Sequence, residues 1–140
     1  MYQIAIERNG RKGHVINNLR AEINLGLKKG YGGFTQEKEE VLNFLTEQYK
    51  EALSEGKNYI PFVVTDSVIT YAYPDGNGFM AEHEPALVLT ADKSPLYGDE
   101  SDEEWQGMVE EYATALAEGF EQSRVYVSYT RAEVKIFQRS

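Results

Sequence analysis

The order of elements predicted from this sequence favours an α+β fold of the ferredoxin-like βα(α)ββαβ type. Three observations support it: an alternating strand pattern at the start, a long strand–turn–strand stretch in the middle, and a capped amphipathic helix followed by a last strand. Right-handed crossovers would place three helices on one face of a four-stranded antiparallel sheet and leave the other face open. With 140 residues, the chain is expected to form a single domain, residues 1–140.

The first strand and the first helix are predicted from residues 2–29. Apolar and polar residues alternate over residues 2–7, as in a half-buried strand. A helix over residues 15–29 is predicted because apolar residues recur there at helical spacing, at Ile16, Leu19, Ile23 and Leu27. The alternative is a hairpin turn at Asn9-Gly10, which would make residues 11–16 a second strand. We prefer the helix.

Two further helices and a last strand follow from capping signals and periodicity. Thr35 is a plausible N-cap for a second helix that ends at Gly56. Ser101 and Glu104 form a capping box at the start of a third helix, whose apolar face is the one expected to pack on the sheet. A last strand begins near Arg124, and its alternation changes phase at residues 130–131, which predicts a bend or a short hairpin.

The central stretch, residues 58–91, is predicted to form two long strands around the turn Pro74-Asp75-Gly76-Asn77-Gly78. A change of apolar phase before this turn predicts a bulge near residues 65–67. Centring the turn on Gly76 puts Glu82 and Glu84 on the face opposite the tyrosines, because side chains alternate between faces. That register pairs Tyr73 with Phe79, Tyr71 with Ala81, and Ile69 with His83.

Composition and charge exclude several classes of protein. The chain has no cysteine, so it has no disulfide, no thiolate metal site and no cysteine nucleophile. It has no apolar run long enough for a membrane span and no signal-peptide pattern, so we expect a cytoplasmic protein without a membrane partner. The net charge is −9, and residues 58–123 hold fourteen acids against one base, Lys93. This argues against a nucleic-acid partner.

No motif for catalysis or for a cofactor stands out. The sequence contains no nucleophile elbow, no P-loop and no dinucleotide fingerprint. The string Glu82-His83-Glu84 resembles a metal site, but adjacent strand residues point to opposite faces and cannot converge on one ion. We therefore predict no catalytic residue, no metal and no cofactor, and we interpret His83 as a packed or hydrogen-bonded histidine.

A basic loop near the N-terminus is the candidate ligand site. It follows the first strand and would open the first helix, where backbone N–H groups and the helix dipole favour anions. Residues 1–32 hold six bases and two acids, a net charge of +4 in an acidic chain. The simpler alternative is a solvated turn. The predicted anion-binding residues are Gly10, Arg11, Lys12, Gly13, His14 and Arg20.

The functional hypotheses follow from charge and from tyrosine content. The acids of residues 99–104 either satisfy a helix dipole or dock on a basic protein partner. Ten tyrosines and an open sheet face favour self-association, since tyrosine is enriched at interfaces. We thus predict a non-enzymatic, small acidic binding or regulatory domain that forms a homo-oligomer. The first alternative is a protein that binds or sequesters an anionic, nucleotide-like small molecule, and the second is a carboxylate-based enzyme.

Overall fold

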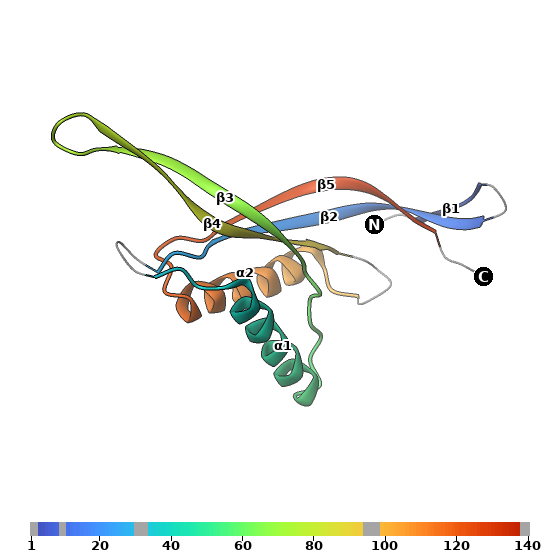
Figure 1. Cartoon of the computed structure of the whole chain (residues 1–140). Helices are drawn as coiled ribbons and strands as arrows, with labels where there is room; N and C mark the ends of the chain where they lie inside the picture. Colours follow the sequence, from blue (N-terminus) through green and yellow to red (C-terminus); the bar gives the residue numbers. More distant parts are fainter. Residues whose placement is uncertain (1–2, 9–10, 30–33, 94–98, 138–140) are drawn as a thin grey trace.

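The computed structural model describes residues 3–8, 11–29, 34–93 and 99–137, and within them the chain forms one antiparallel sheet and two helices. Both helices lie on the same face of the sheet, and two long strand assemblies extend past them (Figure 1). Neither helix is long and apolar enough to cross a membrane. The elements are β1 (Gln3–Arg8), β2 (Arg11–Gly26), α1 (Lys38–Ser54), β3 (Val63–Pro74), β4 (Phe79–Asp92), α2 (Asp102–Gly119) and β5 (Tyr126–Phe137).

The long strand β2 is the centre of the sheet. One of its edges pairs with β5 from Gly13 to Asn24. Its other edge is shared: β1 pairs with the first part of β2, and β4 pairs with the part from Arg20 to Gly26. Strand β3 pairs only with β4 and continues with it beyond the end of β2. The outer part of the β3–β4 hairpin is therefore a two-stranded arm with no third strand beside it (Figure 1).

The core lies between the helices and the middle of the sheet. The strands supply alternate residues, Ile23 and Leu25 from β2 and Leu89 from β4, all fully buried. The helices supply Val41 from α1 and Leu116 from α2, which are also fully buried. Burial of this kind is the main favourable term in folding, so this layer holds the domain together. Leu45 of α1 and Trp105 of α2 are buried in the same layer, so the apolar face of α2 packs on the sheet as predicted.

The ferredoxin-like prediction is wrong, because the segment 15–29 is a strand and not a helix. Its apolar residues fit both the 3.6-residue period of a helix and the two-residue period of a strand. The two-residue period accounts for more of them, since the buried residues are Leu19, Ala21, Ile23, Leu25 and Leu27. The predicted helix used only part of that set. Strand pairing on both edges of β2 then decides in favour of extended structure, as tertiary context often does. The described chain therefore has five strands and two helices, not four strands and three helices.

The hairpin alternative at the N-terminus is the correct one. Arg8 pairs with Arg11, and β1 then runs antiparallel to the start of β2. Residues 9 and 10, which join the two strands, lie outside the described residues. The last strand is also simpler than expected, because β5 pairs with β2 without any interruption across residues 130–131. Exposed and half-buried residues alternate along β5, and this alternation changes phase at residues 130–131 although the pairing with β2 continues.

The helix starts were predicted with mixed success. Ser101 caps α2 as expected, with its Oγ accepting a hydrogen bond from the backbone N–H of Glu104 at 3.1 Å. Thr35 does not cap α1, which begins three residues later. Glu37 precedes α1, and its backbone N–H donates to the carboxylate of Glu40 at 3.3 Å. A carboxylate in the first turn satisfies the exposed N–H groups as well as a hydroxyl would.

The register of the β3–β4 hairpin differs by one residue from the prediction. Pro74 pairs with Phe79, and four residues connect the strands, closed by a hydrogen bond from the N–H of Asp75 to the carbonyl of Gly78 at 3.1 Å. Tyr73 then pairs with Met80 and Tyr71 with Glu82, without any bulge at residues 65–67. Since a slip of one residue exchanges the two faces of a strand, the tyrosines share a face with Glu82 and Glu84.

Candidate functional site

Two tyrosines and one carboxylate form a cluster on the β3–β4 arm. The hydroxyl of Tyr71 donates to one carboxylate oxygen of Glu82 at 3.0 Å, and the hydroxyl of Tyr73 donates to the other at 3.1 Å. The two rings are stacked, with centroids 6.3 Å apart and planes 24° apart. Tyr71 and Tyr73 lie on the same face because they are two residues apart in β3, and strand pairing places Glu82 directly opposite Tyr71. We call Tyr71, Tyr73 and Glu82 the tyrosine–glutamate cluster.

The hydrogen bonds of this cluster keep its carboxylate charged. Donation from Tyr71 and then from Tyr73 lowers the pKa of Glu82, and the positive charge of Lys28 acts in the same direction. The same bonds raise the pKa of both tyrosines, because the anionic acceptor favours their protonated forms. At neutral pH the cluster is therefore one fixed negative charge beside two aromatic rings.

This arrangement has the chemistry of a cation site. A carboxylate attracts a cation directly, and the faces of aromatic rings attract one through their quadrupole. The carboxylate also has both oxygens held in place, so it needs little reorganisation when a ligand arrives. Tyr71 and Glu82 are half-buried, whereas Tyr73 is 41% exposed, so the cluster is open to a ligand from solution. Bulky, organic cations are the ligands that such a site suits best.

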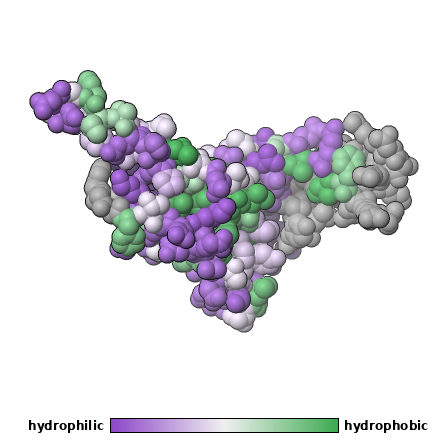
Figure 2. All heavy atoms as spheres, viewed as in Figure 1, coloured by the Kyte–Doolittle hydropathy of each residue, from purple (hydrophilic) through white to green (hydrophobic). Residues whose placement is uncertain are grey.

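The cluster has both charged and apolar side chains around it on the arm. Glu84 follows Glu82 on the same face of β4, near Gly26 at the end of β2. Toward the tip, Phe79 is 82% exposed and Met80 is exposed as well, and toward the body Val68 and Ile69 are exposed opposite Pro85 and Glu84. Figure 2 shows apolar and hydrophilic side chains intermixed along this arm. The cluster thus lies near a second carboxylate, with exposed apolar side chains on both sides of it along the arm.

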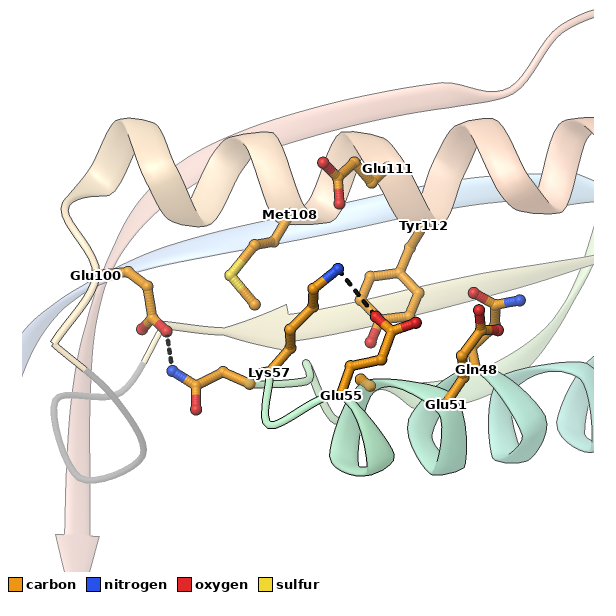
Figure 3. A pocket seen from close by; sticks show the side chains of 10 residues that line it. Gln48, Glu51, Glu55, Lys57, Glu100, Met108, Glu111 and Tyr112 are labelled. Carbon is orange, nitrogen blue, oxygen red and sulfur yellow. Dashed lines mark hydrogen bonds and ion pairs between the residues drawn. The ribbon is translucent and has the colours of Figure 1, made fainter.

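A second concave region lies between the helices, away from the arm. It is a cleft of about 420 Å³ with carboxylates of α1 and α2 at its rim and Met108 and Tyr112 at its base (Figure 3). Lys57 pairs with Glu55 at 2.9 Å, and Asn58 donates a hydrogen bond to Glu100 across the same region. Lys57 therefore offsets part of the negative charge of this cleft, since Glu51 and Glu111 also act on it.

The predicted anion site is not built as expected. Gly10 lies outside the described residues, and residues 11–14 are part of β2 instead of a loop before a helix. The helix dipole that motivated the prediction is therefore missing at Arg11, Lys12, Gly13 and His14. Arg20 forms a two-point ion pair with Asp92, with Nε 2.7 Å from one carboxylate oxygen and Nη2 3.2 Å from the other. Anion binding at this segment stays a prediction.

The other two sequence motifs have structural partners. Asp102 pairs with Lys93 at 3.1 Å and with Arg131 at 2.5 Å, and these contacts lower its pKa. This acid therefore fastens α2 to the sheet, while docking of residues 99–104 on a basic protein stays a prediction. The interpretation of His83 as a packed residue is wrong: it pairs with Thr70 and is exposed. Within the described residues, no group of three or more acids or histidines is arranged to hold a metal ion.

Sequence reasoning missed the tyrosine–glutamate cluster through one geometric error. Both tyrosines and Glu82 were identified, but the turn centred on Gly76 placed them on opposite faces of the hairpin. The available signal was the turn itself, because Asp75-Gly76-Asn77-Gly78 also fits a four-residue connection, another common hairpin length. That choice alone brings the carboxylate under the two hydroxyls.

Comparison with known proteins identifies an enzyme with the same fold. No protein-family model and no curated protein sequence matches the chain. Among solved structures, a phage SAM lyase in complex with S-methyl-5'-thioadenosine matches with a TM-score of 0.55 and 19% sequence identity, over 87% of this chain and 91% of that one. A phage SAM lyase in the apo state matches with a TM-score of 0.54 and 18% identity, over 89% of this chain and 92% of that one. At these identities the likeness concerns the fold alone.

This comparison corrects the main functional prediction. The sequence was interpreted as a non-enzymatic regulatory domain, with an anion-binding protein as the first alternative, whereas the solved structures that share its fold are those of an enzyme. The compound bound in one of them is a thioether nucleoside. The purely regulatory role is therefore wrong, and the ferredoxin-like description was already overturned by the extended conformation of residues 11–26.

Proposed function

We propose that this protein is an enzyme that binds S-adenosylmethionine (SAM), or a close sulfonium relative, and cleaves it to release S-methyl-5'-thioadenosine. The observation that carries the proposal is the ionised Glu82, held between Tyr71 and Tyr73, in a fold shared with a SAM lyase. The substrate is an organic cation, which is the class of ligand that the tyrosine–glutamate cluster suits. A cytoplasmic location, expected from the sequence, is part of this proposal.

The chemistry of the substrate explains why such a cluster would be useful. The sulfur of SAM has three carbon substituents and a permanent positive charge, so no change of pH removes it. Because the sulfonium has no hydrogen to donate, it is recognised by charge and by aromatic faces rather than by hydrogen bonds. When the bond between sulfur and the γ-carbon of the methionine chain breaks, its electron pair moves to sulfur and leaves a neutral thioether, while an oxygen of the substrate's own carboxylate forms the new bond to that carbon and closes a lactone.

The low pKa of Glu82 indicates what this residue would do in the reaction. A carboxylate whose anionic form is stabilised is a weak base, so Glu82 is poorly suited to remove a proton. It is well suited to hold the sulfonium at a fixed place in the site. Because the positive charge at sulfur fades as the bond breaks, the carboxylate also loses its attraction for the product. We therefore assign Glu82 to substrate binding and product release.

Incubation of the purified protein with SAM tests the proposal, with chromatographic detection of S-methyl-5'-thioadenosine. The wild type is expected to form this product, and Glu82→Gln is expected to raise KM by about tenfold or more, as expected for losing a contact to a charged group. Glu22→Gln provides a matched control, because Glu22 is an exposed acid on β2, away from the arm. Product formation that is absent in the wild type, or unchanged in Glu82→Gln, contradicts the proposal.

We also propose that the protein is a homo-oligomer in which a second copy covers the β3–β4 arm. The arm leaves Val68, Tyr73, Phe79 and Met80 exposed, although side chains of this kind are usually buried when enough surface is available. An interface there would also shield the tyrosine–glutamate cluster from water. Sedimentation at micromolar concentration is expected to give a mass above that of the 15.9 kDa monomer. A monomer under these conditions contradicts this part of the proposal.

A further inference from the structure

Gly26, the last residue of β2, creates a small space beside the tyrosine–glutamate cluster. It is not one of the glycines with a positive φ, so its backbone would accept an ordinary side chain. An added Cβ would lie 3.0 Å from Oε1 of Gln122 and 3.3 Å from Oε1 of Glu84, so these two side chains would have to shift to admit it. A glycine in such a place often marks the close approach of another group.

The two oxygens beside Gly26 come from elements far apart in the sequence, and both are acceptors. Gln122, after α2, is fixed by its Nε2, which donates to the carbonyl of Lys28 at 2.8 Å and to that of Phe120 at 3.2 Å. This leaves its Oε1 directed toward Gly26. Neither this Oε1 nor the carboxylate of Glu84 has a hydrogen bond or an ion pair with another described residue. The two side chains beside Gly26 therefore present hydrogen-bond acceptors that have no donor among the described residues. We call Glu84 and Gln122 the acceptor pair.

We infer that this acceptor pair, formed by Glu84 and Gln122 over Gly26, binds the α-ammonium group of the substrate. The inference deepens the proposed function and depends on it. An ammonium offers several N–H donors and a positive charge, so it satisfies both oxygens and the charge of Glu84 together. A hydroxyl pair of the ribose would satisfy the oxygens but not the charge.

The spacing along β4 agrees with this assignment. Glu82 and Glu84 are two residues apart on one face, which corresponds to about 6.7 Å along a strand. In SAM, three carbon atoms separate the sulfonium sulfur from the α-nitrogen, so one methionine chain can reach from one carboxylate to the other. The sulfonium would lie at the tyrosine–glutamate cluster and the ammonium over Gly26. Lys28, whose charge already acts on Glu82, is placed to attract the substrate carboxylate.

Two neutral thioethers isolate the ammonium contact. S-adenosylhomocysteine has the amino-acid chain, and S-methyl-5'-thioadenosine lacks it, while both have the same nucleoside and an uncharged sulfur. By isothermal titration calorimetry, the wild type is expected to bind the first more tightly. Glu84→Gln and Gly26→Ala are expected to reduce that preference by about tenfold, as expected for losing a charge-assisted contact, and to leave binding of the second compound within about twofold.

Two control variants keep the result specific. Gly107→Ala makes the same change as Gly26→Ala at a site where an added Cβ meets no atom within 4 Å, so it should alter neither affinity. Glu82→Gln should leave the preference between the two thioethers unchanged, because neither has a charged sulfur. Circular dichroism of each variant should match that of the wild type.

The outcomes separate this inference from the proposed function. If the wild type binds neither compound and forms no product from SAM, both fail. If it forms product but binds the two thioethers equally, the ammonium contact is overturned while the proposed function stands. If Glu84→Gln weakens both compounds to the same extent, the acceptor pair binds the nucleoside instead, and the inference is again overturned. Only a selective loss of S-adenosylhomocysteine binding supports it.

Discussion

The two halves of β4 belong to different parts of the molecule. From Ala86 to Ala91 the strand lies between β2 and β3 and under the helices, and Leu87 and Leu89 are fully buried. From Phe79 to Glu84 it pairs with β3 alone, and none of its side chains is buried. One continuous strand thus contributes to the core at one end and to an uncovered arm at the other.

The two halves of β4 are expected to differ in role, because the covered half stabilises the fold and the uncovered half is available for binding. A two-stranded hairpin has little stability of its own in water, so the outer arm depends on the covered half to hold it in place. Because the arm contributes no buried side chain, it can expose a carboxylate and aromatic rings without weakening the core. Substitutions in the covered half should therefore change the free energy of unfolding, and substitutions in the arm should change binding.

The largest expected effect is on stability in the covered half. Leu89→Ala should lower the free energy of unfolding by about 2–5 kcal/mol, because it removes a fully buried side chain and leaves a cavity. Phe79→Ala removes a larger side chain from the same strand, but Phe79 is 82% exposed, so the expected change is under about 0.5 kcal/mol. Urea unfolding at a protein concentration low enough for the monomer to predominate in sedimentation measures both. Equal losses would show that the arm is as important to folding as the core.

A smaller effect is expected on the pH dependence of binding at the arm. Folding lowers the pKa of Glu82, so its ionised form stabilises the native state above the ordinary carboxylate value of 4.5, and this contribution is lost as the pH falls through the lowered pKa. Binding of a SAM analogue with a protonated amine in place of the sulfonium should weaken over the same pH range, because it depends on the negative charge of Glu82. In the double variant Tyr71→Phe, Tyr73→Phe the two main causes of the lowered pKa are removed and only Lys28 still lowers it, so the loss of binding should begin at a higher pH.

A matched control for this experiment is Tyr129→Phe. The hydroxyl of Tyr129 also donates to a carboxylate, that of Glu110 at 2.7 Å, but on the helix side of the sheet. Its removal should leave the pH profile of binding unchanged. A calorimetric titration between pH 7 and pH 4 that gives the same midpoint for the double variant and the wild type would show that the tyrosines do not control Glu82.

The sequence predicted most of the elements but not how they pair. The strand–turn–strand stretch and the capped start of α2 follow from local chemistry, and both are present. The helix predicted over residues 15–29 failed because Leu19, Ile23 and Leu27 fit either period, and the choice depended on strand pairing with β4 and β5. That pairing joins segments about 60 to 125 residues apart, as a comparison of the paired positions shows, and it leaves no local signal.

The candidate site was missed because the predicted register of the β3–β4 hairpin was wrong by one residue. Tyr71, Tyr73 and Glu82 were all within the stretch of highest interest, and only the length of the turn decided whether they met. The acceptor pair over Gly26 was beyond sequence reasoning altogether, because Gln122 reaches it from the other end of the chain. Local patterns identify the residues of such a site, whereas register and chain packing bring them together.

The central claim is that the ligand site is on the arm and not in the cleft between the helices. Titration of a SAM analogue that has an amine in place of the sulfonium and keeps the amino-acid chain, followed by amide shifts in a two-dimensional NMR spectrum of the labelled protein, tests it directly. The account predicts that the shifts concentrate at Tyr71, Glu82 and Gly26. Shifts concentrated at Glu51, Glu111 and Tyr112, which line the cleft between α1 and α2, would contradict it.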